Sequence, residues 1–231
     1  MDSQRVFATA VAYLVLLLSL SAREAFKAWT AEICGDSTAR VLGRVSLNPI
    51  RHLDIVGSLI LPAVLLAFGA PVFGWGRPVP VFEKNLRDPY RGGLLVAAAG
   101  PFCSFTIGLL AALALLIAVR VTGTEGKDAA TWALFHLWDK AVGAPHFPLM
   151  FTLTGLVTVN AFLTVFHLIP LPPLDGGRLA VYLLPQDWAE KLAAIRPTGF
   201  MIGMALALFV VAALVLPLFF GILSVLIQFV A

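Results

Sequence analysis

Long apolar runs constrain the fold of this chain more than any other feature of its sequence. A helix needs about 20 apolar residues to cross the hydrocarbon core of a bilayer. Of the 231 residues, 60% are hydrophobic and 13% are charged, whereas a soluble domain has about 25% charged residues. The sequence therefore predicts a membrane protein and excludes a soluble globule. The apolar runs cover residues 7–22, 55–73, 93–119, 148–174 and 199–230.

The first run has two interpretations. Ser19-Leu-Ser-Ala22 is similar to the cleavage site of a signal peptide. However, Asp2 weakens the basic region that a signal peptide needs, and helix-forming residues continue through Arg23–Trp29. We therefore interpret the run as a retained helix that extends beyond residue 22.

Proline marks the second and the last run. Pro62 and Pro71 interrupt the second, and the Pro-rich, β-branched stretch that follows predicts a small extended or re-entrant element between residues 71 and 92. The last run, 199–230, contains Pro217 and is either one kinked span with an interfacial tail or a helical hairpin. The predicted fold is an all-α polytopic bundle of about five transmembrane helices, forming a single domain over 1–231.

Basic residues are distributed unevenly between the loops. If 55–92 enters the membrane and returns, segments 23–54, 77–91 and 175–196 share one face and carry 12 of the 16 Lys and Arg residues. The positive-inside rule makes that face cytoplasmic. The net charge of +3 is smaller than a nucleic-acid-binding surface needs. The expected partner is the lipid bilayer into which the apolar runs insert. The opposite face would keep Arg5, Arg120, Lys127 and Lys140.

Glu24 and Asp175 are the ionisable residues that most need an explanation, because a charge beside an apolar span is costly unless it is paired or functional. Each also has an ordinary interpretation. Glu24 would form an i,i+3 ion pair with Lys27 at a helix end, and Asp175 would be a turn residue before Gly176-Gly177.

A series of short motifs, in the same order, resembles the site-2 protease family of intramembrane zinc metalloproteases in its short bacterial form without a PDZ domain. The resemblance extends over about residues 10–185, with 199–230 as an additional C-terminal helix or hairpin. It implies a bacterial cytoplasmic membrane protein with its site near the cytoplasmic face. The matching segments are Gly35–Arg40, Leu42–Asp54, Gly57–Pro62, Gly74–Val81, Asn85–Arg87, Ala99–Pro101 and Leu168–Gly177.

In that family the first segment carries HExxH, which supplies two zinc-binding histidines and a general-base glutamate. The aspartate before paired glycines is the third zinc ligand. Here the HExxH frame reads Arg23-Glu24-Ala-Phe-Lys27. The resemblance thus assigns the general-base position to Glu24 and a ligand position to Asp175, while cations occupy both histidine positions.

Three further positions depart from the family pattern. His167 stands where an asparagine is usual eight residues before the ligand aspartate, and Phe105 stands where an asparagine commonly follows the Gly-Pro turn. Ile55 stands where a proline usually follows Asp54. A trio of His167, Glu24 and Asp175 would use the base as a ligand, so we interpret His167 as a hydrogen-bonded core histidine instead.

These departures remove the usual donors for zinc. Catalytic zinc takes about three protein ligands and a water. Arg23 has no lone pair to donate, and a lysine such as Lys27 is not among the usual zinc ligands. No zinc is therefore expected.

The two cations also suggest how the fold could do without the metal. Arg23 and Lys27 would balance Glu24 and Asp175 and keep the cluster near neutrality. This hypothesis predicts that one or both cations lie within ion-pair reach of Asp175. In the alternative, their long side chains snorkel to the membrane interface.

Three functions are compatible with this sequence. The first is a zinc-less pseudoprotease that binds a transmembrane segment or partner without cutting it. The second is an active intramembrane zinc metalloendopeptidase, as the family resemblance alone implies. The third is a small transporter or channel with Glu24, Asp175 and His167 along a polar pathway.

Overall fold

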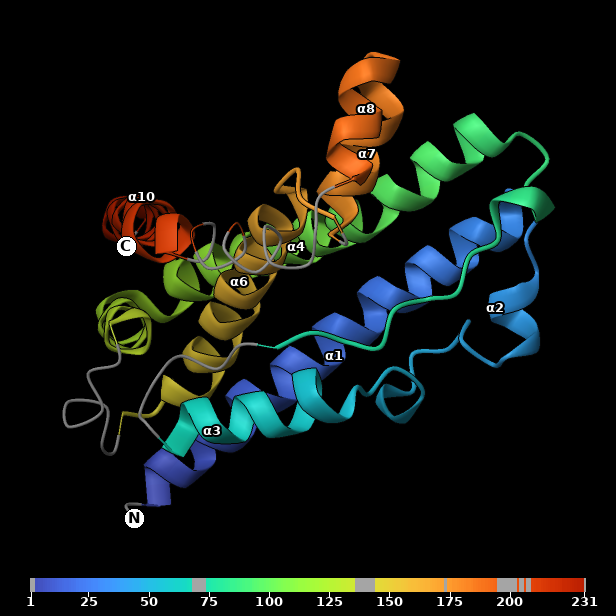
Figure 1. Ribbon diagram of the computed structural model, residues 1–231. Coiled ribbons are helices and arrows are strands. Elements are labelled where there is room, and N and C mark those ends of the chain that lie inside the picture. The colour runs from blue at the N-terminus through green and yellow to red at the C-terminus, as the bar shows by residue number, and fades with distance from the viewer. Residues whose placement is uncertain are drawn as a thin grey trace.

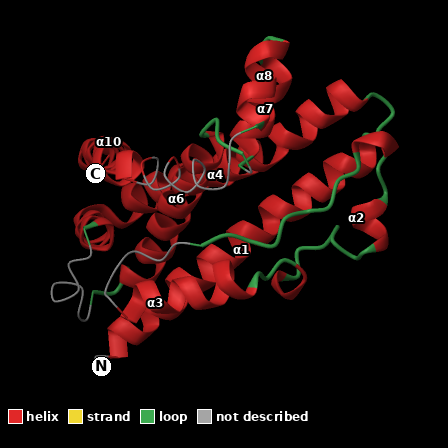
Figure 2. Ribbon diagram, in the orientation of Figure 1, coloured by secondary structure: helices red, strands yellow, loops and turns green. Residues whose placement is uncertain are grey.

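The computed structural model describes residues 3–67, 74–135, 144–172, 174–194, 203, 206 and 209–230, and within these ranges it contains helices and loops but no strand (Figures 1 and 2). The predicted all-α polytopic class is confirmed. The count of five transmembrane helices stays a prediction, because a further apolar helix, Ile55–Leu65, is shorter than a span. The helices long and apolar enough to cross a membrane are Phe7–Ile33, Pro89–Leu134, Phe147–Leu168 and Ala213–Val230.

The bundle is built on α1, α4 and α6, and α4 packs against both of the others and against α10. Within α4, Gly123 has a φ of 65° and a ψ of −143°, so two helical segments meet there at a residue without a Cβ. In chain order the elements are α1 (Ser3–Ile33), α2 (Thr38–Val41), η1 (Pro49–Arg51), η2 (Ile55–Ile60), α3 (Leu61–Ala67), η3 (Glu83–Asn85), α4 (Pro89–Leu134), α6 (Phe147–Leu168), α7 (Asp175–Leu183), α8 (Gln186–Ala193), η4 (Val211–Val215) and α10 (Leu216–Val230).

Helix α1 confirms that helical structure continues past residue 22. It is one helix of 31 residues, and its C-terminal third carries the altered HExxH frame. The loop after α1 is fixed by Asp36, which is fully buried and accepts hydrogen bonds from the backbone N–H of Thr38 and Phe82 at 3.0 and 2.7 Å. The end of α1 is therefore tied to the segment that precedes α4.

The segment between the second apolar run and α4 is extended at 74–82 and runs beside α1 (Figure 1). Trp75 N–H donates to the carbonyl of Gly57, and the Ser58 hydroxyl donates to the carbonyl of Trp75 at 2.8 Å. The predicted extended element thus lies within the expected range. Whether η2 and α3 re-enter the membrane stays a prediction, and 71–73 lie outside the described residues.

From Phe209 to Val230 the chain is one continuous helix that passes through Pro217 without reversing. The π-helical segment η4 directly precedes α10, next to the proline, which lacks a backbone N–H to donate. Whether 199–230 as a whole is one span or a hairpin stays a prediction, because most of residues 199–208 lie outside the described ranges.

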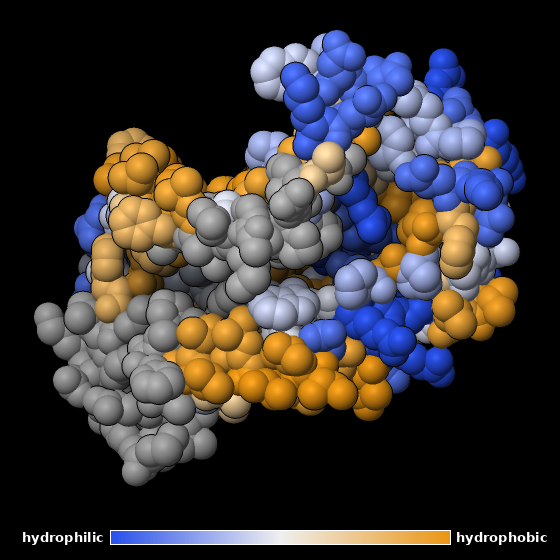
Figure 3. Space-filling view, viewed as in Figure 1, coloured by the Kyte–Doolittle hydropathy of each residue, from blue (hydrophilic) through white to orange (hydrophobic). Residues whose placement is uncertain are grey.

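The described parts of the three basic segments lie toward the end of the bundle that holds α7 and α8 (Figure 1). Arg87 N–H donates to the carbonyl of Cys34 at 2.9 Å, and the Tyr182 hydroxyl donates to Glu83 at 2.6 Å. In Figure 3 hydrophilic residues cover this end, around α7 and α8, whereas α3 and α10 present hydrophobic surface.

Candidate functional site

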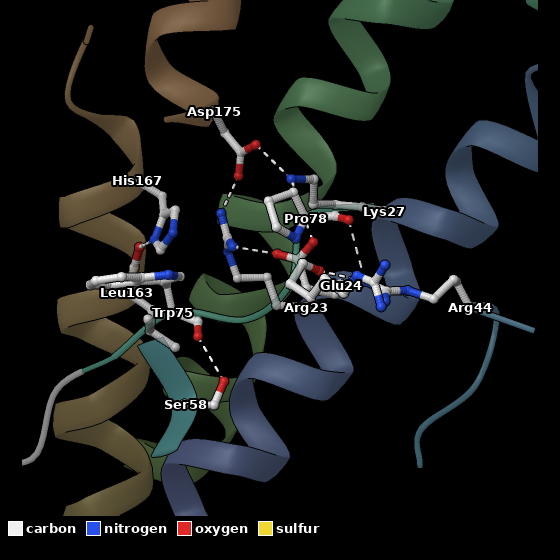
Figure 4. A network of polar contacts seen from close by, with 11 residues as sticks. Arg23, Glu24, Lys27, Arg44, Ser58, Trp75, Pro78, Leu163, His167 and Asp175 are labelled. Carbon is white, nitrogen blue, oxygen red and sulfur yellow. Dashed lines mark hydrogen bonds and ion pairs between the residues drawn. The ribbon is translucent and has the colours of Figure 1, made fainter. Parts of the chain in front are cut away.

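The altered HExxH frame meets Asp175 in a buried ion cluster between α1 and α7 (Figure 4). Lys27 Nζ donates to Asp175 Oδ1 at 2.7 Å, and Arg23 Nη2 donates to Asp175 Oδ2. Arg23 Nη1 also donates to Glu24 Oε1 at 2.7 Å. The four residues are only 2–6% exposed. The predicted contact with Asp175 is confirmed for both cations, and the snorkelling alternative is wrong.

Helix geometry explains how α1 delivers both cations. Arg23 and Lys27 are four residues apart, so they project from one face of the helix. Asp175 is the first residue of α7, where the helix dipole favours a carboxylate. A Cβ at Gly176 or Gly177 would collide with the backbone of residues 168–172. The paired glycines therefore allow the tight turn that aims Asp175 at α1.

Helix α4 forms the third wall through a residue without a side chain. A Cβ built at Gly100 would lie 2.8 Å from Asp175 Oδ2, 2.9 Å from Lys27 Cδ and 3.1 Å from Arg23 Nη2. The absence of a side chain at Gly100 thus leaves room for the cluster to close against α4. The Ala99–Pro101 motif signalled this position, but its role could not be assigned from the sequence.

Arg44 and His52 were missed as members of this region. Arg44 is 6% exposed, lies beside Glu24 in Figure 4, and donates to the carbonyls of Arg77 and Pro78. His52 is 2% exposed, and its Nε2 lies 2.7 Å from the carbonyl oxygen of Ser46. Both belong to the Leu42–Asp54 motif. The charged residues of this motif are typical of an exposed loop in the sequence, but the extended segment covers them in the structure.

Arg44 corrects the expectation that the cluster is near neutral. Three buried cations, Arg23, Lys27 and Arg44, accompany the two buried carboxylates of Glu24 and Asp175. Burial alone would raise the pKa of Asp175, but Lys27 and Arg23 hold that pKa below its ordinary value. The carboxylate of Asp175 is therefore ionised at neutral pH.

His167 lies beside the ion cluster (Figure 4). Phe105 lies away from it. The His167 ring is 6% exposed, and its Nδ1 lies 2.9 Å from the carbonyl oxygen of Leu163 on the same helix. This agrees with a hydrogen-bonded core histidine. Phe105 is 56% exposed on the outside of α4 and makes no contribution to the cluster.

The donor set does not fit zinc. Arg23 has no lone pair, and the Lys27 ammonium is hydrogen-bonded to the carboxylate that would be the metal ligand. Across the described ranges, no three His, Cys, Asp or Glu side chains are grouped so that they could hold a metal ion. His167, Glu24 and Asp175 therefore do not form a replacement site.

Comparison with known proteins places this chain in a family. The chain is 32% identical over 199 residues to "Putative zinc metalloprotease YwhC" of Bacillus subtilis, covering 84% of this chain and 79% of that protein. The chain belongs to this site-2-protease-like family. A member named "Putative zinc metalloprotease Rip2" from Mycolicibacterium smegmatis is 29% identical over 191 residues, covering 82% of this chain and 63% of the relative.

The Rip2 protein of Mycobacterium tuberculosis (strain H37Rv) is 31% identical over 172 residues, which is 74% of this chain and 56% of the relative. The chain spans less than two thirds of the length of both mycobacterial relatives. No protein-family model matches the chain. No solved structure matches it. Membership of the site-2-protease-like family thus rests on curated relatives whose names include zinc, while the donor set here does not fit that metal.

Proposed function

We propose that this chain is a zinc-less pseudoprotease of the site-2-protease-like family, which binds a transmembrane segment of another protein without cutting it. One observation carries the proposal: both carboxylate oxygens of Asp175 are bound by Arg23 and Lys27. These cations stand at the positions that the family resemblance assigns to the zinc-binding histidines.

The chemistry of peptide hydrolysis supports this reading. A catalytic zinc lowers the pKa of its bound water towards ~7 and polarises the scissile carbonyl. Among the described residues around Asp175 there is no pair of imidazoles to hold such an ion. Glu24 Oε1 accepts a hydrogen bond from Arg23, and Glu24 Oε2 lies 3.8 Å from Lys27 Nζ, so both carboxylate oxygens of Glu24 are in ion pairs.

Metal analysis of the purified full chain in detergent tests the proposal. We expect well under one zinc per chain after incubation with zinc, and no change in thermal unfolding on adding a chelator. Stoichiometric zinc would contradict the proposal. So would cleavage of a transmembrane peptide that the substitution Glu24→Gln abolishes.

The curated relatives favour one alternative, an active intramembrane zinc metalloendopeptidase, because their names describe zinc metalloproteases. The same two measurements separate the functions. An active enzyme would hold zinc and would lose cleavage with Glu24→Gln, whereas the pseudoprotease would show neither property.

We also propose that the chain resides in the bacterial cytoplasmic membrane with the ion cluster near the cytoplasmic face. The gathering of the basic segments at the α7 end supports this orientation. A single cysteine introduced as Lys191→Cys, in a chain with Cys34 and Cys103 replaced by alanine, should react with an impermeant thiol reagent only in inside-out vesicles. Labelling from the outside of intact cells would reverse the orientation.

A further inference from the structure

A cavity of about 400 Å³ lies between α4, α7 and the extended segment before η3. Its lining includes Ala97 and Gly177, which are close in sequence to Gly100 and Asp175 of the ion cluster. Its polar side chains are those of Glu83, Arg178 and Tyr182, and its apolar surface includes Val81, Val96 and Val181. The cavity is therefore lined by apolar side chains and by side chains of both charges.

The two charged residues have no ionic partner in the described part of the chain. Neither Arg178 nor Glu83 forms an ion pair there. Glu83 accepts one hydrogen bond, from the Tyr182 hydroxyl at 2.6 Å, which fixes one of its carboxylate oxygens. The cavity thus offers a free guanidinium and a carboxylate with one uncommitted oxygen.

The cavity lies where the apolar part of α4 begins. Gly93 and Ala97, which line it, are four and eight residues after Pro89, the first residue of α4. Gly93 is also the first residue of the apolar run 93–119. A spanning helix enters the hydrocarbon core where its apolar run begins, so a cavity at this level is within reach of lipid headgroups.

Two tyrosines mark the same level. The rings of Tyr90 and Tyr182 pack edge to face with centroids 5.8 Å apart, and the Tyr90 hydroxyl donates to the carbonyl of Tyr182 at 2.8 Å. Tyrosine is enriched at membrane–water interfaces. A Cβ at Gly93 would collide with the Tyr182 hydroxyl, so the glycine allows Tyr182 to reach Glu83 across the cavity.

We propose that this cavity binds the headgroup of a zwitterionic phospholipid with a primary ammonium, as in phosphatidylethanolamine. The guanidinium of Arg178 pairs with the phosphate, and the carboxylate of Glu83 accepts hydrogen bonds from the ammonium. The ester region and first acyl carbons lie against Val81, Val96 and Val181. The site is separate from the proposed pseudoprotease function and does not depend on it.

Lipid selectivity tests the proposal on the purified full chain. Native mass spectrometry would compare phosphatidylethanolamine, phosphatidylcholine and phosphatidylglycerol with identical acyl chains. We expect phosphatidylethanolamine to bind roughly tenfold more tightly than either, because charged hydrogen bonds from its ammonium to Glu83 are absent in the others. Equal binding of the three lipids would overturn the proposal.

Single substitutions assign the two halves of the headgroup. Glu83→Gln should remove the preference for phosphatidylethanolamine. Arg178→Gln should weaken the binding of all three lipids roughly tenfold. Tyr182→Phe keeps the ring but removes the hydrogen bond to Glu83, and it should retain the preference. Unchanged selectivity in Glu83→Gln, with normal thermal unfolding, would refute the assignment.

Matched controls and a soluble probe complete the experiment. Arg91→Gln and Asp187→Asn change exposed charges at the same end of the bundle but outside the cavity, and they should leave lipid selectivity unchanged. Soluble glycerophosphoethanolamine should compete weakly, because it lacks acyl chains. If it binds as tightly as the intact lipid, the ligand is a free headgroup and the assignment to a membrane lipid is wrong.

Discussion

Lys27 Nζ donates a hydrogen bond to Asp175 Oδ1 at 2.7 Å, joining α1 to α7 across 148 residues of sequence. Arg23 binds the other oxygen of the same carboxylate, so Asp175 has a cation on each side. The family resemblance assigns these positions to two zinc-binding histidines and a third zinc ligand. Here the side chains of Arg23 and Lys27 connect the two helices through Asp175.

Removing the shared carboxylate should destabilise the protein strongly. Asp175→Ala leaves the cations of Arg23 and Lys27 buried without their partner, which costs about 3–5 kcal/mol of unfolding free energy. Thermal and denaturant unfolding in detergent would measure the loss. The control Asp187→Ala removes an exposed carboxylate of α8 and should change stability by less than about 0.5 kcal/mol. An Asp175→Ala protein as stable as the parent would show that the cluster contributes nothing to folding.

Restoring imidazoles should restore metal binding. The double substitution Arg23→His with Lys27→His places two histidines four residues apart opposite Asp175, which completes three ligands for zinc. We expect about one zinc per chain by elemental analysis, and a lower thermal midpoint after chelation. The same chain with Asp175→Ala added should bind far less zinc. Absence of zinc from the folded double variant would refute the correspondence between the ion cluster and a metal site.

Gly100 should tolerate no side chain. Gly100→Ala would place a methyl group 2.8–3.1 Å from atoms of Asp175, Lys27 and Arg23, and the resulting overpacking should cost about 1–3 kcal/mol. Gly155→Ala on α6 is the matched control, since a Cβ there meets nothing within 4 Å. Alanine in an open helical position should be neutral or stabilising by up to about 1 kcal/mol. Equal effects of the two substitutions on unfolding would contradict this assignment.

Acid should weaken the loop that Asp36 organises. Burial alone would raise its pKa, but hydrogen bonds from Thr38, Phe82 and Asn85 outweigh burial and hold the pKa of Asp36 below its ordinary value. A carboxyl with a lowered folded pKa stabilises the fold fully above its unfolded pKa of about 3.9, and this stabilisation is lost as the pH falls through the folded value. Stability should therefore hold from pH 7 to about 5 and fall below about 4.

Asp36→Asn checks this origin. An amide cannot accept all the bonds of the carboxylate, so the substitution should cost about 1–3 kcal/mol at pH 7. It should also reduce the loss of unfolding free energy at low pH, measured by denaturant unfolding. A variant with the same loss at low pH as the parent would assign the pH dependence to other carboxyl groups.

The fold class followed from local properties of the sequence. Apolar runs of span length specify membrane helices because a bilayer forces each segment to satisfy its own backbone hydrogen bonds. The boundaries of the helices were harder to predict from the sequence. The run 93–119 belongs to a helical segment that begins at Pro89 and reaches Gly123, where a second segment that ends at Leu134 begins, because hydropathy marks the apolar part of a helix and not its ends. Asp88 and Pro89, as N-cap and first helical residue, were the local signals for its start.

The chemistry of the site was also fixed by the sequence, since an arginine at position 23 cannot ligate zinc in any conformation. Only the tertiary structure decided where the cations point. A long side chain at a helix end gains either from reaching water or from pairing with a buried carboxylate. That balance depends on the turn that brings Asp175 to α1, on the space left at Gly100, and on Arg44 arriving from a loop. These are contacts between distant segments, and no local pattern encodes their distances.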